Sequence, residues 1–233
     1  MTIRIGHASI SEKGTINGVK GDQTGKEVCI RSWYSKPWDY MALHPDATVR
    51  EKHASAIEAA CVNNNIGYGQ GDRNTLNALA KTVGYDLSRV GKCNCDCSSL
   101  QNVAAVASGA SGVTYGNNGW TTANMKSALQ KAGYKIIIDR GYLADKEYCV
   151  RGAIYVKAGS HTVCGLDNGE CYKKTLDKVG ISQPCPAGLK SIEQVAREVV
   201  AGKWGNGSDR KKKLEVAGYN YAQVQAAVNK ICK

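Results

Sequence analysis

The chain has 233 residues, a formal net charge of +11 at pH 7 and a hydrophobic content of 42%. This length allows one large domain or a medium domain with a small module, and the hydrophobic content excludes a disordered chain. The charge favours an anionic partner, and nucleic acid, an acidic membrane surface and an anionic cell wall all qualify. No apolar run approaches the roughly 20 residues that span a bilayer. The first residues lack the apolar stretch of a signal peptide. We therefore expect no membrane partner, and synthesis in a cytoplasm with exit, if any, by another route.

The chain contains ten cysteines. A disulfide scaffold would normally be shorter and follow a signal peptide. Cys93, Cys95 and Cys97 have Cys-x-Cys-x-Cys spacing, whereas structural zinc sites favour Cys-x-x-Cys pairs. We therefore predict no metal and no cofactor, and expect most of the thiols to be reduced and partly buried.

Residues before position 93 predict a strand at 28–33 and helices at 47–63 and 75–83. Aromatic side chains around Pro37 suit either a surface that stacks on a sugar or peptide, or a small core under a loop. His53 lies on the apolar face of its helix and is interpreted as a packed histidine. His7 and His44 stand in irregular segments and carry no second indication of function.

An acidic residue, a cysteine and two serines, Asp96 to Ser99, stand directly before an apolar-periodic run. That run consists of Leu100, Val103, Ala104 and Ala107. Its helical spacing predicts a helix that begins at or just after Cys97. Backbone N–H groups and the macrodipole at a helix N-terminus favour negative charge, which lowers the pKa of a thiol there. Cys97 is therefore the candidate nucleophile.

A catalytic thiol needs a base, and His161 is the one histidine downstream of Cys97. It opens an apolar run at 161–166 that reads as a strand, joined to a strand at 153–156 by a turn that contains Gly159. Helices come mostly before these hairpins, which predicts an α+β fold with the cysteine helix against a small antiparallel sheet.

The last part of the chain changes character. Residues 173–190 contain prolines and glycines with little periodicity and are predicted to be a linker. Residues 191–233 carry three short amphipathic helical patterns, which should form a compact three-helix bundle. A bundle this small leaves little room for a catalytic site, so we expect it to bind a ligand.

Residues 1–172 resemble the phage peptidoglycan amidohydrolases related to the NlpC/P60 cysteine peptidases. The matching motifs are Gly21-Asp22-Gln23-Thr24-Gly25-Lys26-Glu27-Val28, Trp33-Tyr34 with Trp38, Ile66-Gly67-Tyr68 with Gln70 and Arg73, Asp96-Cys97-Ser98-Ser99, and Arg151-Gly152 with Ser160-His161-Thr162-Val163. The resemblance implies a papain-like fold, with Cys97 as nucleophile and His161 as base.

The same resemblance implies further roles. Tyr68 would line the substrate groove, with Gln70 and Ser98 as additional substrate contacts. The polar residue that orients the histidine usually follows it on the next strand. Asp167 or Asn168 is the choice that this chain offers.

Residues 191–233 resemble the CW_7 cell-wall-binding repeat through the run from Val195 to Gly207, Ala217-Gly218-Tyr219-Asn220-Tyr221 and Val224-Gln225. This resemblance implies a module that binds the muropeptide of peptidoglycan, with Trp204, Arg210 and Tyr219 as plausible contacts. A single copy would need avidity from the first domain or from oligomers.

The sequence thus predicts a peptidoglycan hydrolase of the endolysin type that cleaves an amide bond by a Cys-His mechanism. The bond is either the N-acetylmuramoyl-L-alanine amide or one within the stem peptide. One alternative is a non-catalytic wall-binding protein with an inert Cys97. Another is a nucleic-acid-binding protein. It is disfavoured because the basic residues are scattered, with one run at 211–213.

Overall fold

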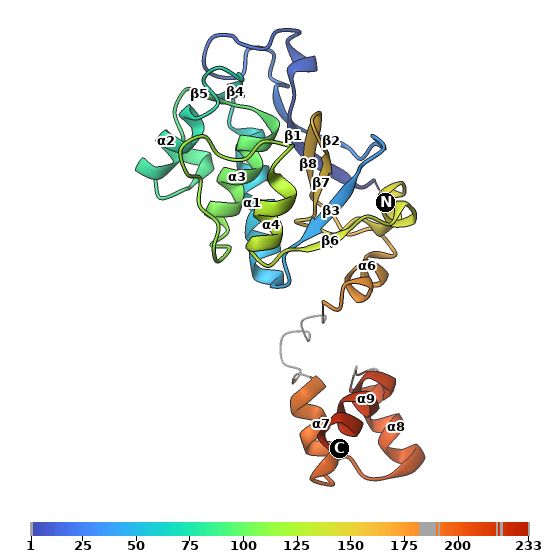
Figure 1. Ribbon diagram of the computed structural model, residues 1–233. Coiled ribbons are helices and arrows are strands. Elements are labelled where there is room, and N and C mark those ends of the chain that lie inside the picture. The colour runs from blue at the N-terminus through green and yellow to red at the C-terminus, as the bar shows by residue number, and fades with distance from the viewer. Residues whose placement is uncertain (1, 182–189, 191, 218, 220, 233) are drawn as a thin grey trace. The chain divides into compact units, whose positions relative to one another are not determined.

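The computed structural model describes residues 2–181, 190, 192–217, 219 and 221–232. The chain forms two units, Met1–Ser182 and Gln183–Lys233 (Figure 1). No helix within the described ranges is both long and apolar enough to cross a membrane. The nine cysteines in these ranges are unpaired, and eight of them are buried or half-buried.

The first unit mixes strands and helices, which confirms the predicted α+β class. Its strands are β1 (Arg4–Ala8), β2 (Val28–Ser32), β3 (Tyr40–Leu43), β4 (Ile66–Tyr68), β5 (Cys93–Cys95), β6 (Lys135–Ile137), β7 (Ile154–Lys157) and β8 (His161–Gly165). Its helices are α1 (Ala47–Val62), α2 (Thr75–Thr82), α3 (Cys97–Ala107), α4 (Met125–Lys131), α5 (Arg140–Leu143) and α6 (Tyr172–Lys178), with 3-10 turns at Ile10–Glu12, Leu87–Arg89 and Lys146–Tyr148.

The main sheet has six antiparallel strands in the order β2-β1-β8-β7-β3-β6. Its alternating side chains supply two separate cores. Tyr40, Ala42, Ile154 and Val156 pack with α4 on one face, and Met41, Leu43, Tyr155 and Val163 form a core with Leu176 of α6 on the other. Helices α1 and α3 lie on the first of these faces, where they share a core with Cys164 of β8 (Figure 1). The N-terminal strand β1 lies beside β8 in this sheet, although the two strands are far apart in the sequence.

Helix α3 begins at Cys97, as the sequence predicts. The side chain of Asp96 accepts a hydrogen bond from the backbone N–H of Ser99 at 2.7 Å, and the hydroxyl of Ser99 accepts one from the backbone N–H of Asp96 at 2.8 Å. This reciprocal capping box satisfies two backbone donors at the helix start. Leu100, Val103 and Ala104 are fully buried, so packing and capping together fix where Cys97 stands.

The end of the first unit differs from the prediction. The predicted linker at 173–190 begins too early, because α6 occupies its first part and Leu176 and Ile181 are buried in the core of the first unit. Lysines surround the apolar residues of this segment, so its sequence shows no clear helical pattern. The rest of the predicted linker, 182–189, lies outside the described residues.

The second unit is a three-helix bundle of α7 (Ile192–Val200), α8 (Gly207–Val216) and α9 (Tyr221–Ile231), as predicted. Its core joins residues of all three helices: Val195, Ala196, Val199, Leu214, Tyr219, Val224 and Val228.

Candidate functional site

The start of α3 meets the start of β8 inside the first unit. Helix α3 packs against β8, and the backbone N–H groups of Thr162 and Ser98 lie close enough to the sulfur of Cys97 to lower its pKa. Thr162 directly follows His161, the first residue of β8. The structure therefore brings the predicted nucleophile to the residue beside the predicted base, although 64 positions (161 − 97) separate the two in sequence.

The side-chain partner of His161 is His7 of β1. Nε2 of His161 lies 3.1 Å from Nδ1 of His7, and the two rings meet edge to face with centroids 5.3 Å apart. Trp38 stacks on the other side of His161 at a centroid distance of 6.4 Å. Because one proton lies between the two nitrogens, one imidazole must donate and the other must accept. His7 was not selected by the sequence analysis.

The predicted orienting residues Asp167 and Asn168 lie elsewhere. Asp167 follows the far end of β8, about 20 Å along the chain from His161 at 3.3 Å per residue. Its carboxylate accepts from the backbone N–H of Arg4 at 2.8 Å and from the Arg4 guanidinium at 2.9 and 2.7 Å. Asn168 accepts from the backbone N–H of Arg151 at 2.8 Å. Both side chains are therefore engaged beyond the end of β8 that is remote from His161, where Arg4 and Arg151 bind them.

Burial decides the charges of the Cys97 site. Burial, followed by the charge of Asp96, raises the pKa of Cys97 to about 12, although the N–H groups of Thr162 and Ser98 act in the opposite direction. Burial lowers the pKa of His161 to about 4. Burial and then the proximity of His161 lower the pKa of His7 to about 3. The expectation of a lowered thiol pKa is therefore wrong: the resting site holds a neutral thiol and two neutral imidazoles.

The negative charge next to the thiol is partly compensated by Arg73. Its Nε lies 2.7 Å from Oδ2 of Asp96, and its Nη2 donates to Oδ1 of Asp96 and to the hydroxyl of Ser98. Ser98 is 4% exposed and also donates to Asp96. The side chain of Ser98, predicted to contact substrate, instead belongs to this buried network.

Tyr68, predicted to line the substrate groove, is 4% exposed and stands near the thiol. The parallel pairing of β4 with β5 places Tyr68 beside Cys95, two residues before Cys97. The Tyr68 hydroxyl accepts from the exposed side chain of Gln70 at 3.0 Å. Burial first, and then the charge of Cys97 among others, raises the pKa of Tyr68 to about 12, so the phenol is neutral.

A buried carboxylate holds the strand of Tyr68 in place. Glu27 is 0% exposed and accepts from the backbone N–H of Tyr68 at 2.9 Å. Nζ of Lys13 lies 3.6 Å from the same oxygen and also donates to the carbonyl of Tyr68. The ion pair thus ties the segment before β2 to β4.

A cleft of about 1140 Å³ opens over the same region. His7, Tyr34 and His161 line its wall together with Glu12, Cys29 and other residues of β2 and its neighbouring loops. Cys97 is 7% exposed and does not line this cleft. A Cys97 thiolate would raise the pKa of Tyr34, which lines the cleft, so the thiol lies near the cleft wall.

The second unit has a smaller cavity of about 540 Å³. Trp204 lines it with Lys190, Glu198, Lys203 and Lys213, and the Trp204 indole donates to Glu198 at 3.1 Å. Tyr219 packs edge to face on Trp204 and is 6% exposed within the core. Arg210 donates to the carbonyl of Gly205. Of the three predicted ligand contacts, Trp204 alone lines this cavity.

Residues 5–172 match the endolysin-like domain family. The chain belongs to that family. Residues 193–232 match the CW_7 repeat. A lysozyme of Streptococcus phage Cp-7 is 51% identical over 43 residues, which cover 18% of this chain and 13% of the phage protein. The chain therefore spans only a small part of that relative. No solved structure matches.

Within this endolysin-like domain, Cys97 and His161 were candidates from the sequence, whereas His7, which pairs with His161, was not. Strand β1 is buried from Ile5 to Ala8, and its register places His7 opposite Cys29 in the β1–β2 pair. No local motif connects His7 with His161, so the pair becomes visible only when β1 and β8 lie side by side.

Proposed function

We propose that this endolysin-like protein is a peptidoglycan hydrolase that cleaves an amide bond in the peptide part of the wall. Cys97 acts as nucleophile and His161 as general base. The finding that carries the proposal is the packing of α3 against β8, which puts the Cys97 sulfur near the backbone N–H of Thr162, the residue next to His161. Family membership and the phage lysozyme match support the substrate class.

The mechanism starts from a neutral site. His161 takes the proton from the Cys97 thiol as the sulfur attacks the amide carbonyl, and later returns it to the leaving amine. Water then hydrolyses the acyl-enzyme. The Nε2–H group of His161 donates a hydrogen bond to Nδ1 of His7, and this bond orients the His161 ring. Nδ1 of His161 then carries no proton and can act as the base. The backbone N–H of Cys97, at the first position of α3, is assigned to the oxyanion.

The papain-like NlpC/P60 relationship is part of the same proposal. A cysteine at the start of a helix packed against an antiparallel sheet, with a histidine on the adjoining strand, supports it. The bond cleaved is either the N-acetylmuramoyl-L-alanine amide or a bond within the stem peptide.

The second unit is proposed to bind the muropeptide of the wall. The CW_7 match and the cavity beside Trp204 support this role. Lys190, Lys203 and Lys213 at the cavity suit the carboxylates of stem peptides.

The test uses purified cell walls and the full chain. Release of fragments is followed by turbidity, and mass spectrometry of the fragments locates the new amino group. C97S and H161N should each lower the rate by about a thousandfold or more, and H7N should lower it less, with a changed pH profile. C171S removes a half-buried thiol directly before α6 and serves as the matched control. Retained lysis by C97S would refute the mechanism, and wall binding without lysis by the unaltered chain would favour the non-catalytic alternative.

A further inference from the structure

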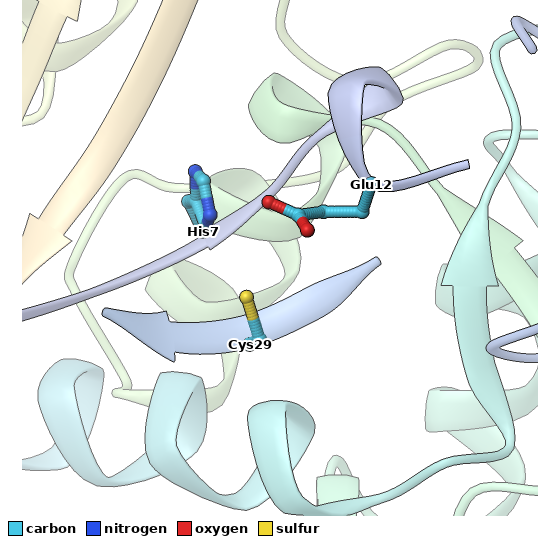
Figure 2. A group of neighbouring side chains, drawn as sticks. All are labelled: His7, Glu12 and Cys29. Atoms are coloured by element: carbon cyan, nitrogen blue, oxygen red, sulfur yellow. The ribbon is translucent and has the colours of Figure 1, made fainter. Parts of the chain in front are cut away.

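Three potential metal ligands converge on the cleft wall. His7 comes from β1, Glu12 from the 3-10 turn that follows it and Cys29 from β2, and Figure 2 shows their side chains pointing toward one another. One donor atom of each lies within 4.8 Å of the others. His7 and Cys29 are direct partners in the β1–β2 register, which places both side chains on the same face of the sheet.

The buried imidazole of His7 needs a further partner. His7 is 1% exposed, one of its nitrogens pairs with His161, and Nε2 is buried without a hydrogen-bond partner among the described residues. Leaving such a polar atom unsatisfied costs about 1–3 kcal/mol. A bound cation would engage an imidazole nitrogen and remove part of that cost.

The donor set selects the class of cation. A thiolate, an imidazole and a carboxylate together suit Zn²⁺, whereas Mg²⁺ and Ca²⁺ require oxygen ligands. Tetrahedral zinc with bonds of about 2.0–2.3 Å places its donors about 3.5 Å apart, so the side chains would have to close by about 1 Å. Oε1 of Glu12 lies 2.6 Å from Arg31, whose positive charge opposes a cation, but the other carboxylate oxygen is outside that contact.

We propose that His7, Glu12 and Cys29 bind one Zn²⁺ and that this binding inhibits hydrolysis by withdrawing His7 from its role beside His161. The inhibitory part depends on the proposed function, and the binding part does not. A fourth position open to the cleft would be filled by water.

The inhibition follows from the proton between the two imidazoles, whichever nitrogen binds the metal. With Zn²⁺ on Nε2, Nδ1 of His7 carries its proton and donates to Nε2 of His161. His161 then keeps its own proton on Nδ1 and cannot accept another without placing two protons between the rings. With Zn²⁺ on Nδ1 of His7, the 3.1 Å contact with His161 is lost.

Binding is tested on the metal-free full chain with Zn²⁺ by calorimetry and with Co²⁺ by absorption. One equivalent should bind, and Co²⁺ should give a thiolate-to-cobalt charge-transfer band. C29S should abolish the band, and both C29S and E12Q should weaken Zn²⁺ binding by at least tenfold. C171S, which removes a half-buried thiol elsewhere, should leave both signals unchanged. If C29S still bound one equivalent of metal and still gave the charge-transfer band, the proposed site would be wrong.

Inhibition is tested as the ratio of initial wall-lysis rates with and without Zn²⁺ in the same protein. At ten times the Kd, the ratio should be about one tenth for the unaltered chain and close to one for C29S. Equal inhibition of both proteins, or activation by Zn²⁺, would overturn the coupling. A chain that binds Zn²⁺ through Cys29 but never lyses walls would refute the proposed function and leave the metal site standing.

Discussion

The reactivity of the Cys97 thiol toward alkylation is the sharpest test of its environment. Burial raises its pKa to about 12 from 9.0 for an ordinary thiol. Because the thiolate is the nucleophile, the reactive fraction at pH 7 should be about 1000-fold smaller than that of a free cysteine. Its alkylation rate should rise about tenfold per pH unit from pH 6 to 9, since the thiol remains far below its pKa throughout.

The assay is reaction with iodoacetamide, followed by proteolysis and mass spectrometry that resolves each cysteine peptide. The exposed Cys232 is an internal control for reagent access. H161N should change the Cys97 rate little, because a neutral imidazole does not hold a thiolate. A fast rate that stays constant below pH 7 and disappears in H161N would show a thiolate–imidazolium pair. The argument that burial raises the pKa of Cys97 more than the helix N-terminus lowers it would then be wrong.

Two further predictions concern stability. E27Q leaves the side chain of Lys13, which is 6% exposed, without its counter-charge, so the free energy of unfolding should fall by about 3 kcal/mol in urea titrations. K13M/E27Q should recover part of this loss, and equal stability of E27Q and the unaltered chain would contradict the role of the pair. Burial lowers the pKa of all four histidines, and most strongly those of His7, His53 and His161. The unfolded chain therefore binds more protons below about pH 6.5, and stability should fall toward pH 4 by up to about 4 kcal/mol per pH unit. A flat profile above pH 5 would contradict it.

Features that depend on neighbours in sequence were predictable. Asp96 and Ser99 form the cap that the Asp-Cys-Ser-Ser pattern suggests, and Cys97 is the first residue of α3. The hairpin of β7 and β8 turns through 158–160, as the glycine indicated. His53 is packed, with its Nε2 2.9 Å from the Gln101 side-chain oxygen. In each case a short stretch contains both the signal and the structure that it specifies.

The orienting residue was not predictable in the same way. The resemblance places the orienting residue on the strand that follows the histidine, but the element after β8 is helix α6. In the sheet, β8 lies next to β1, and this strand contributes His7 from near the N-terminus. Asp167 was a candidate because it is acidic and close to His161 in sequence. It lies beyond the opposite end of β8, however, where it forms an ion pair with Arg4.

A neutral partner for His161 changes how the proposed reaction is driven. No carboxylate touches the His161 ring among the described residues, so an imidazolium there would be stabilised by the lone pair of His7 and by the thiolate that forms with it. The imidazolium and the thiolate stabilise each other only while both are charged. This stabilisation is therefore limited to the steps in which the thiol loses its proton and the proton is returned. In the proposed mechanism, substrate binding would have to make this charge pair favourable, and a group that occupied the His7 nitrogens would raise the barrier without touching Cys97.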